Sequence, residues 1–201
     1  MVRIIAGEAK SQRIKIPGFT NKIRPTSDKV KEALFSILGA KILNARVLDL
    51  FCGSGNLGLE SLSRGAGFCF FVEKNNVCLR YLEQNIKQLH YEQKSKVVKG
   101  DILKILDMKS TDISGVNLIF ADPPYDETDI WFTEHSGKIN LLKMLEKSGI
   151  LSTFFTFVLE HRKDFTLSET FLSPYMWKRK DYGSTSLTII EPVYTGGELD
   201  E

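Results

Sequence analysis

From about residue 45 onward, the chain alternates short apolar segments with segments whose apolar residues recur at helical spacing. Short apolar segments between turn signals are typical of buried strands, and a repeated strand–helix order produces a parallel sheet with helices on both faces. The sequence therefore predicts an α/β fold built on a mostly parallel sheet. The expected strands cover residues 47–51, 68–72, 96–99, 116–121 and 154–159, and an antiparallel hairpin over 175–180 and 186–190 follows them.

The first part of the chain has a different pattern. Residues 2–16 alternate loosely between apolar and polar side chains, which predicts a small β-hairpin. Thr26 or Ser27 can then cap a helix, and helical spacing of apolar residues continues to Gly39. We therefore expect a basic hairpin and helix over residues 1–42, an α/β body over 43–194 and an acidic tail over 195–201.

The net charge of +2 hides an uneven distribution. Residues 1–46 carry ten basic and three acidic residues, a net charge of +7, whereas the remainder carries 17 basic and 22 acidic residues, a net charge of −5. A basic segment on a mildly acidic body suits a polyanionic partner, although a solvated basic surface without a partner gives the same count. In the first interpretation, the residues that contact phosphate groups are Arg3, Lys10, Arg13 and Arg24.

Composition excludes several other classes of protein. Hydrophobic residues make up 42% of the chain, which is ordinary for a globular core and excludes a disordered or collagen-like protein. The longest apolar stretch, residues 150–159, is interrupted by Ser and Thr and is shorter than the ~20 residues of a membrane span. No secretory signal is recognisable, and the three Cys fit neither a disulfide framework nor a zinc site. We therefore expect a cytoplasmic protein with reduced thiols, no metal and no membrane partner.

A glycine-rich turn over residues 49–58 follows the first strand of the α/β body and opens a helix. Gly53 and Gly55 allow the backbone to turn sharply and a ligand to approach closely. Glu73, at the end of the next strand, can accept hydrogen bonds from both hydroxyls of a ribose. Asp101, after the third strand, can reach the edge of an adenine.

The glycine spacing alone leaves the ligand open, because dinucleotide-binding proteins share it. A dehydrogenase would hold a pyrophosphate at this turn, and a methyltransferase would hold the amino-acid end of S-adenosylmethionine. Asp49 favours the methyl donor, since a carboxylate facing the turn would repel a pyrophosphate but can serve an ammonium group. A tight turn without any ligand is a third interpretation.

The fourth strand runs into Asp122-Pro123-Pro124-Tyr125. Two successive prolines remove two backbone donors and keep the chain extended, which predicts carbonyl groups that have no internal partner. A carboxylate and a carbonyl can together accept the hydrogens of an exocyclic amine, which frees the nitrogen lone pair. Asp122 would stabilise the positive charge that develops on nitrogen, and Tyr125 offers a ring on which a base can stack. The alternative is a proline-rich turn without chemistry.

Taken together, these motifs resemble the RsmD family, which are bacterial 16S rRNA (guanine-N2)-methyltransferases. The resemblance extends from Arg3 to about Ile190. It is carried by Arg3-Ile-Ile-Ala-Gly7, Arg24-Pro-Thr-Ser-Asp28 with Val30, Glu32, Leu34 and Phe35, Asp49-Leu-Phe-Cys-Gly-Ser-Gly55 with Leu57 and Gly58, Phe71-Val-Glu73, Asp122-Pro-Pro-Tyr125 and Tyr182-Gly-Ser-Thr185 with Leu187.

The resemblance implies a class I, Rossmann-like S-adenosylmethionine-dependent methyltransferase with a seven-stranded sheet and a small N-terminal hairpin and helix. It implies a guanine of small-subunit rRNA, within a ribosomal particle, as the methyl acceptor. We further expect a monomeric enzyme and a direct methyl transfer that needs no metal. By motif match, the donor site contains Asp49, Gly53, Gly55, Glu73 and Asp101, and the amine site contains Asp122, Pro123, Pro124 and Tyr125.

Two features depart from the family pattern. Cys52 and Asn56 stand where the family more often has Ala, and Asn56 could change a polar contact in the donor loop. The stretch from Thr128 to Lys138 is polar and irregular, which suggests a loop over the target base.

Three other functions remain open from the sequence. An N6-adenine methyltransferase acting on DNA would use the same amine site, although so short a chain has no second target-recognition domain. A non-catalytic nucleic-acid-binding module would use only the basic segment, and a nicotinamide dehydrogenase would use the glycine turn. Carbon methylation of a pyrimidine is disfavoured because it needs a thiol nucleophile, and Cys52, Cys69 and Cys78 have the patterns of structural residues.

Overall fold

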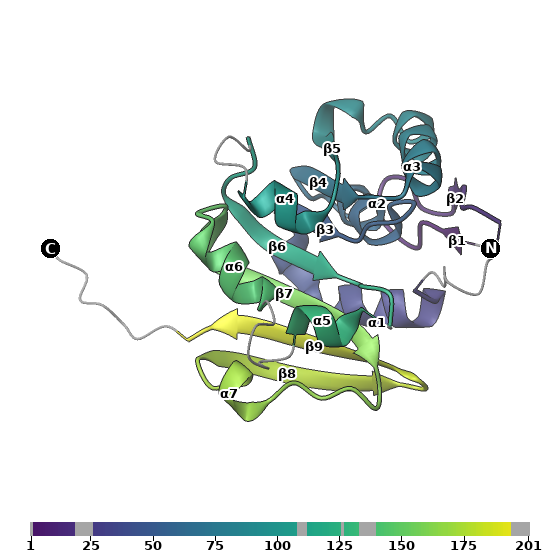
Figure 1. Ribbon diagram of the computed structural model, residues 1–201. Coiled ribbons are helices and arrows are strands. Elements are labelled where there is room, and N and C mark those ends of the chain that lie inside the picture. The colour runs from purple at the N-terminus through teal and green to yellow at the C-terminus, as the bar shows by residue number, and fades with distance from the viewer. Residues whose placement is uncertain (1, 19–25, 108–111, 126, 133–139, 194–201) are drawn as a thin grey trace, which may run out of the picture.

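A computed structural model describes residues 2–18, 26–107, 112–125, 127–132 and 140–193. A seven-stranded sheet forms its centre, with the strand order β5-β4-β3-β6-β7-β9-β8 (Figure 1). Strands β5, β4, β3, β6 and β7 are parallel, and β9 and β8 continue the sheet in antiparallel pairs. The strands are β3 (Arg46–Leu50), β4 (Phe68–Glu73), β5 (Ser95–Lys99), β6 (Val116–Ala121), β7 (Leu151–Arg162), β8 (Tyr175–Tyr182) and β9 (Thr185–Pro192).

The observed sheet confirms the predicted α/β class and the C-terminal hairpin. Strand β7 begins three residues before the expected start and extends three residues beyond the expected end, at Arg162. Its pairing with β6 shifts register between Val116 and Leu118, so the first residues of β7 lie outside the regular ladder. Phe154, in this irregular part, is 65% exposed. An exposed apolar residue does not mark a buried strand, so apolar periodicity could not locate the start of β7.

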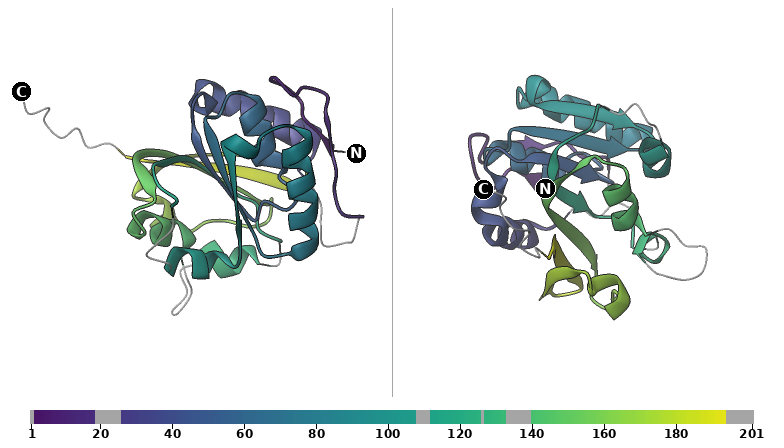
Figure 2. Two further views of the ribbon diagram at one scale, coloured as in Figure 1. Left: turned by 90° about the horizontal axis from the view of Figure 1, so that it is seen from above. Right: turned by 90° about the vertical axis from the view of Figure 1, so that its left-hand side faces the viewer.

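Helices cover both faces of the sheet (Figure 2). One face packs against α1 (Asp28–Leu38), α2 (Asn56–Ser63) and α3 (Asn76–Gln88), and these elements share one hydrophobic core. The other face contributes a second core with α5 (Thr128–Phe132), α6 (Leu141–Lys147) and α7 (Glu169–Leu172), and the start of α4 (Ile102–Asp107) joins it. Short 3-10 turns, η1 (Gly39–Ile42) and η2 (Glu92–Lys94), follow α1 and α3. Among the described helices, none is long and apolar enough to cross a membrane.

Strand order reverses next to β3, since β4 and β5 lie on one side of it and β6 and β7 on the other. Helices leave the carboxyl ends of the parallel strands toward opposite faces at such a point, which opens a crevice at that edge of the sheet. The glycine turn follows β3 and the Asp-Pro-Pro-Tyr motif follows β6, so the topology places both motifs beside this crevice.

The N-terminal hairpin is present and packs closely on α2. Its two strands, β1 (Val2–Arg3) and β2 (Arg13–Ile14), are joined by a turn in which Gly7 has a φ of 86°. A Cβ on Gly7 would lie 1.7 Å from the carbonyl oxygen of Ser63, so only glycine permits this approach. The buried side chains of the hairpin belong to the same core as α1 and α2. A boundary near residue 42 remains a proposal.

Ser27 caps α1, as one of the two predicted alternatives: its Oγ accepts a hydrogen bond from the Val30 N–H at 3.3 Å. Thr26 is buried, and its hydroxyl instead contacts Glu160 on β7.

A buried ion pair joins the hairpin, α1 and α2. Both side chains of Lys31 and Glu60 are 0% exposed, and Lys31 Nζ lies 3.1 Å from Glu60 Oε2. Lys31 also donates to the carbonyl of Arg3 at 2.6 Å, and Glu60 accepts the N–H groups of Ile5 and Ala6 at 2.8 and 3.1 Å. The several hydrogen-bond partners of each charge compensate part of the cost of desolvation, although burial still lowers the pKa of Lys31.

Residues 128–132 correct the expectation that the stretch from Thr128 to Lys138 is irregular, whereas a place over the target base stays a prediction. Residues Thr128–Phe132 form the short helix α5, and Thr128, Trp131 and Phe132 are buried. Apolar packing of Trp131 and Phe132 against the second core favours the helix over an open loop. Residues 133–138 lie outside the described part of the chain, as do residues 195–201 of the expected tail.

Replacement of Lys31 by Met should lower the free energy of unfolding by about 3 kcal/mol, because the buried charge of Glu60 would lose its fully buried partner and keep only the partly exposed Arg64. Urea unfolding would measure the change. The matched control is Lys29→Met on the exposed face of α1, which should change stability by less than about 0.5 kcal/mol. Equal stabilities of the two variants would contradict the structural role of Lys31.

Candidate functional site

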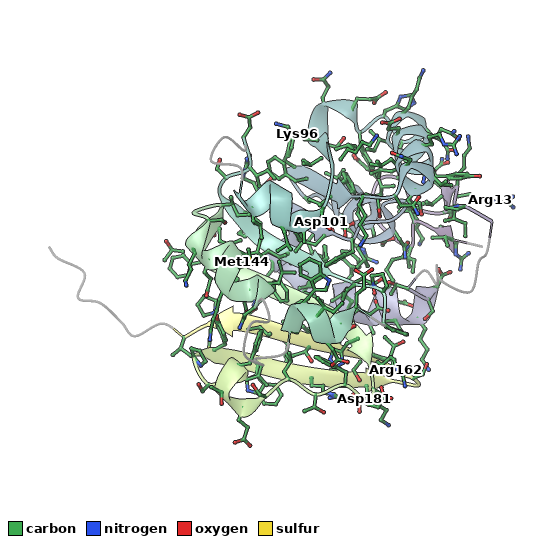
Figure 3. The ribbon with its side chains drawn as sticks, in the orientation of Figure 1. Arg13, Lys96, Asp101, Met144, Arg162 and Asp181 are labelled. Carbon is green, nitrogen blue, oxygen red and sulfur yellow. The ribbon has the colours of Figure 1, made fainter. Side chains whose placement is uncertain are left out.

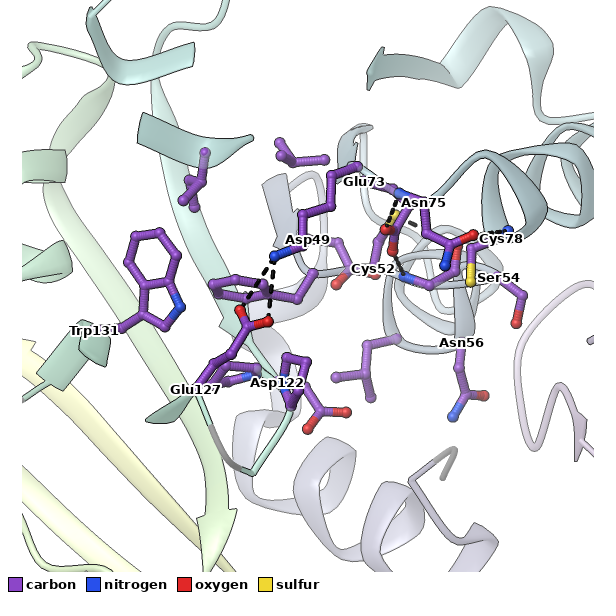
Figure 4. A pocket seen from close by; sticks show the side chains of 18 of the residues that line it. Asp49, Cys52, Ser54, Asn56, Glu73, Asn75, Cys78, Asp122, Glu127 and Trp131 are labelled. Atoms are coloured by element: carbon purple, nitrogen blue, oxygen red, sulfur yellow. Dashed lines mark hydrogen bonds and ion pairs between the residues drawn. The ribbon is translucent and has the colours of Figure 1, made fainter. Parts of the chain in front are cut away.

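A cavity of about 730 Å³ lies at the carboxyl ends of the parallel strands (Figure 4). It brings together residues from the glycine turn, from the ends of β4 and β5 and from the segment after β6. Of the predicted site residues, those that line it are Asp49, Gly53, Glu73, Asp101, Asp122, Pro123, Pro124 and Tyr125. The donor and amine motifs therefore face a single space.

Gly55 belongs to the turn but lies behind the cavity wall. It has a φ of 90° as the residue before α2. A Cβ at this position would lie 2.6 Å from Cδ1 of Leu82 on α3, so the close packing of the turn against α3 requires glycine.

Two carboxyl groups hold the glycine turn in shape. Asp49 Oδ2 accepts the N–H of Gly58 at 2.8 Å, and Glu73 Oε2 accepts the N–H of Gly53 at 2.8 Å. Glu73 Oε1 also accepts the N–H of Asn75 at 2.7 Å. A carboxylate has about four lone-pair positions, so Glu73 keeps capacity for the predicted ribose hydroxyls.

Asp49 is 2% exposed, and burial raises the pKa of its carboxyl group to about 7. The hydrogen bond from Gly58 opposes this shift, and the negative charge of Glu73 adds to it. A buried carboxyl group that titrates near neutrality can become charged when a cation is placed beside it. This property suits the predicted contact with an ammonium group.

Asp101 immediately precedes α4, and its Oδ1 accepts the N–H of Leu103 at 3.0 Å. Figure 3 shows it in the middle of the molecule, on the segment after β5. It lines the cavity beside Ile102, an arrangement that leaves its predicted contact with an adenine edge sterically open.

The Asp-Pro-Pro-Tyr motif leaves β6 at the cavity, but one of its expected features is wrong. The Pro124 carbonyl accepts the N–H of Glu127 at 2.8 Å, so it does not lack an internal partner. This hydrogen bond closes a turn that leads into α5. The sequence near Pro124 did not predict this turn. The Asp122 side chain and the carbonyls of Asp122 and Pro123 remain the candidate acceptors.

Asp122 is half-buried, and its pKa is raised well above the ordinary range. Burial is the main cause, followed by the nearby carboxyl groups of Glu160 and Asp49, and a hydrogen bond with Thr26 opposes the shift. Tyr125 is held by a second contact, since its Oη lies 3.0 Å from Thr185 Oγ1 at the start of β9. The C-terminal hairpin thus fixes the ring proposed to stack on a base.

Sequence patterns missed several residues of the cavity wall. Thr26 and Arg162 line it, as does Trp131, whose ring centroid lies 5.5 Å from that of Phe51. Contacts of this kind join residues that are far apart in sequence, so no local sequence pattern predicts them. The Arg24-Pro-Thr motif drew attention to Thr26, but the motif did not indicate that Thr26 contacts Glu160.

The two departures from the family pattern have structural roles. Asn56 accepts from Lys31 Nζ at 2.8 Å and donates to the Thr26 carbonyl at 3.3 Å, so it ties the glycine turn to the start of α1. Cys52 is buried, and burial raises the pKa of its thiol well above the ordinary value, with the charges of Asp49 and Glu73 adding to the shift. A thiol in that state is a poor nucleophile.

Three of the four predicted phosphate-binding residues lie on the N-terminal hairpin. Arg3, Lys10 and Arg13 are exposed, and Arg3 pairs with Asp28 at 3.0 Å. Figure 3 shows Arg13 at the periphery of the molecule. Arg24 lies outside the described residues. Within the described part of the chain, no group of three or more His, Cys, Asp or Glu side chains is arranged to hold a metal ion.

Comparison with known proteins adds an independent line of evidence. Residues 2–191 match the family model described as Conserved hypothetical protein 95. A putative rRNA methyltransferase YlbH of Bacillus subtilis is 34% identical over 188 residues, which cover 94% of this chain and 97% of that protein. A ribosomal RNA small subunit methyltransferase D of Buchnera aphidicola is 33% identical over 162 residues, which cover 81% of this chain and 79% of that protein.

A solved structure described as putative methyltransferase yhhF from Escherichia coli is 26% identical. It superposes with a TM-score of 0.75 over 95% of this chain and 97% of that chain. Similarity of this extent confirms the class I methyltransferase fold. The chain therefore belongs to the Conserved hypothetical protein 95 family, the RsmD family that its motifs resemble.

Proposed function

We propose that this chain transfers a methyl group from S-adenosylmethionine to the exocyclic N2 of a guanine in 16S rRNA of the small ribosomal subunit. The observation that carries the proposal is the single cavity that both motifs line. A methyl donor held at the glycine turn and an amine held at Asp122 would occupy the same cavity, with no protein wall between them. The named functions of the relatives supply the substrate class.

The residues of the glycine turn fit the donor. Asp49 would accept the ammonium group of the methionine moiety, Glu73 would accept the ribose hydroxyls and Asp101 would accept from the adenine amine. When bound, S-adenosylmethionine supplies an electrophilic methyl group on a sulfonium. Gly53 has open space in front of its backbone, since a Cβ added there would meet no atom within 4 Å, and this space could hold the methionine moiety. Its φ of 56° lies in the left-handed region that favours glycine.

The residues of the amine site would activate the acceptor. Asp122 and a neighbouring carbonyl would accept the two N–H bonds of N2, which reduces conjugation of the nitrogen lone pair with the ring. In the transition state the nitrogen becomes positive, and the carboxylate of Asp122 would stabilise this charge at short range. Tyr125, fixed by Thr185, would stack on the base and hold the nitrogen in line with the methyl group.

Asp122→Ala should lower the rate of methyl transfer at least a hundredfold, because it removes both the acceptor and the stabilising charge. Labelled methyl transfer to small subunits from a strain that lacks the modification would measure the rate, and nucleoside analysis would identify the product. We expect N2-methylguanosine from the unmodified enzyme.

The matched control for this experiment is Asp112→Ala, which removes an exposed carboxylate paired with Lys96. It should leave the rate unchanged. N6-methyladenosine as the product would instead support the alternative acceptor, and an active Asp122→Ala variant would contradict the amine site.

The affinity for the donor product S-adenosylhomocysteine should increase by roughly eightfold between pH 6 and pH 7.5, because an Asp49 carboxyl group with a pKa of about 7 must lose its proton to bind the ammonium group. Below pH 7 most Asp49 carboxyl groups carry a proton, so the affinity for S-adenosylhomocysteine falls there. Calorimetry in two buffers of different ionisation enthalpy would also detect the released proton. In Asp49→Asn the affinity should not depend on pH in this range; an unchanged dependence would show that another group titrates.

Reversal of charge on the hairpin should weaken RNA binding. Lys10→Glu together with Arg13→Glu should reduce the affinity for rRNA at least tenfold at low salt and lower the slope of log K against log salt concentration by about two, as expected for two lost phosphate contacts. The control is Lys143→Glu with Lys147→Glu on α6, which makes the same change in net charge elsewhere. A similar loss in both double variants would indicate a general charge effect.

A further inference from the structure

The described residues that line the cavity carry an excess of negative charge. Five of them are acidic and two are basic, Lys74 and Arg162. Lys74 is compensated, because its Nζ lies 3.3 Å from both carboxyl oxygens of Glu127. An RNA strand that brings a base to this edge of the sheet also brings phosphate groups, which the acidic side chains repel. Such a strand therefore needs positive charge beside the cavity, and Arg162 at the end of β7 is the basic lining residue left to supply it.

Arg162 keeps hydrogen-bond donors for a phosphate although it already forms an ion pair. Its Nε donates to Asp164 Oδ1 at 2.9 Å, and one terminal nitrogen donates to Oδ2 of the same carboxylate. A guanidinium has five N–H groups, so three remain, and the Arg162 side chain is 56% exposed. A guanidinium with free N–H groups can bind a phosphate through two parallel hydrogen bonds. Arg162 can therefore hold a phosphate at the edge of the cavity.

The C-terminal hairpin continues from Arg162 across the sheet. Arg162 lies opposite Thr185 of β9, and Thr185 lies opposite Tyr182 of β8. Residues that are opposite each other in a ladder share one face of the sheet, so these three side chains form a row on that face. The contact between Thr185 and Tyr125 joins this row to the amine motif. Figure 3 shows Arg162 near the turn between β8 and β9.

Two lysines extend the row along β8, which is the edge strand of the sheet. Lys180 and Lys178 precede Tyr182 at every second position, so they share its face and are spaced by ~7 Å. Both are exposed, and in the described part of the chain neither lies within ion-pair distance of a carboxyl group. The intervening residues, Arg179 and Asp181, lie on the opposite face and pair with each other at 2.9 Å. A row of positive charge thus begins at the cavity and runs along the edge of the sheet.

Lysines on an edge strand also have a purely structural explanation. Charge on an exposed edge prevents it from pairing with the edge of another molecule. A charge of either sign serves that purpose, whereas attraction of a phosphate backbone needs a positive charge. The continuity of the two lysines with Arg162, and of Arg162 with the amine motif, favours phosphate binding.

We propose that Arg162, Lys180 and Lys178 form a strip, the C-terminal strip, that binds the phosphate backbone of the RNA strand next to the target base. Arg162 binds the phosphate nearest to the cavity, and the two lysines bind phosphates further along the strand. Phosphate contacts fix the position of a nucleic acid without reading its sequence. The strip therefore sets the position from which a base reaches Tyr125. This inference rests on the proposed function for its role in methyl transfer, whereas RNA binding by the strip can be measured without it.

Reversal of both lysine charges tests the strip directly. Lys178→Glu with Lys180→Glu should reduce the affinity for protein-free 16S rRNA at least tenfold at low salt. It should also lower the magnitude of the slope of log K against log salt concentration by about 1.5, as expected for two lost phosphate contacts on a single strand. The edge of β8 stays charged, so the midpoint of thermal unfolding and the affinity for S-adenosylhomocysteine should not change. Filter binding over a series of salt concentrations would measure the affinity and the slope.

The matched control is Lys143→Glu with Lys147→Glu on α6, which makes the same change in net charge. Its affinity for rRNA should stay within threefold of that of the unmodified protein. An equal loss in the control, or an unchanged affinity in Lys178→Glu with Lys180→Glu, would overturn the proposal. A loss of affinity for assembled small subunits without a loss for protein-free rRNA would place a ribosomal protein on this surface, and it would overturn the proposal as well.

Steady-state kinetics on small subunits from a strain that lacks the modification test Arg162. Arg162→Met should raise KM for the subunits at least tenfold and leave the affinity for S-adenosylhomocysteine unchanged, because it removes a phosphate contact but no residue of the donor site. Arg162→Lys keeps the positive charge, so its KM should stay within threefold of that of the unmodified enzyme. Equal KM values for Arg162→Met and the unmodified enzyme would overturn the role of Arg162. An unmodified enzyme that methylates no guanine, with rRNA affinity still lost in Lys178→Glu with Lys180→Glu, would refute only the proposed function.

Discussion

The buried ion pair between Lys31 and Glu60 fixes the relative positions of α1 and α2, the two helices whose starts line the candidate site. Lys31 lies on α1, which begins just after Thr26, and Glu60 lies on α2, which begins with the glycine turn. Asn56 completes the link, since it contacts both Lys31 and the Thr26 carbonyl. The N-terminal segment is therefore part of the cavity wall and does more than extend a basic surface, because its position decides where the Thr26 hydroxyl lies beside Asp122.

Carboxyl groups recur at the carboxyl ends of the strands, and each has a different environment. Glu73 shapes the glycine turn through two backbone N–H groups, Asp49 is buried with a pKa near 7, and Asp122 lies beside Glu160. Negative charge at this edge suits a reaction in which a sulfonium and a developing ammonium are both positive. The same charges would disfavour a pyrophosphate, which separates this cavity from the dinucleotide sites that share its glycine spacing.

Local patterns predicted the parts of the structure that depend on local rules. Strand–helix alternation, the cap at Ser27 and the glycine turn all follow from residues close in sequence, and they fixed the sheet and the edge where the motifs meet. Local patterns did not reveal Glu160, which is 134 positions from Thr26, or the burial of Lys31, since both depend on tertiary contacts. The helix α5 was missed because its two buried aromatic residues stand in a polar stretch too short to show helical periodicity.

The central claim is that one cavity holds the methyl donor and the amine face to face. A crystal structure of the protein with S-adenosylhomocysteine tests it most directly, because the sulfur marks the point from which the methyl group leaves. We expect the amino-acid end at Asp49, the ribose at Glu73 and the sulfur facing the Asp122 carboxyl group with open space between them. A sulfur that points away from Asp122, or one separated from it by packed side chains, would contradict this account.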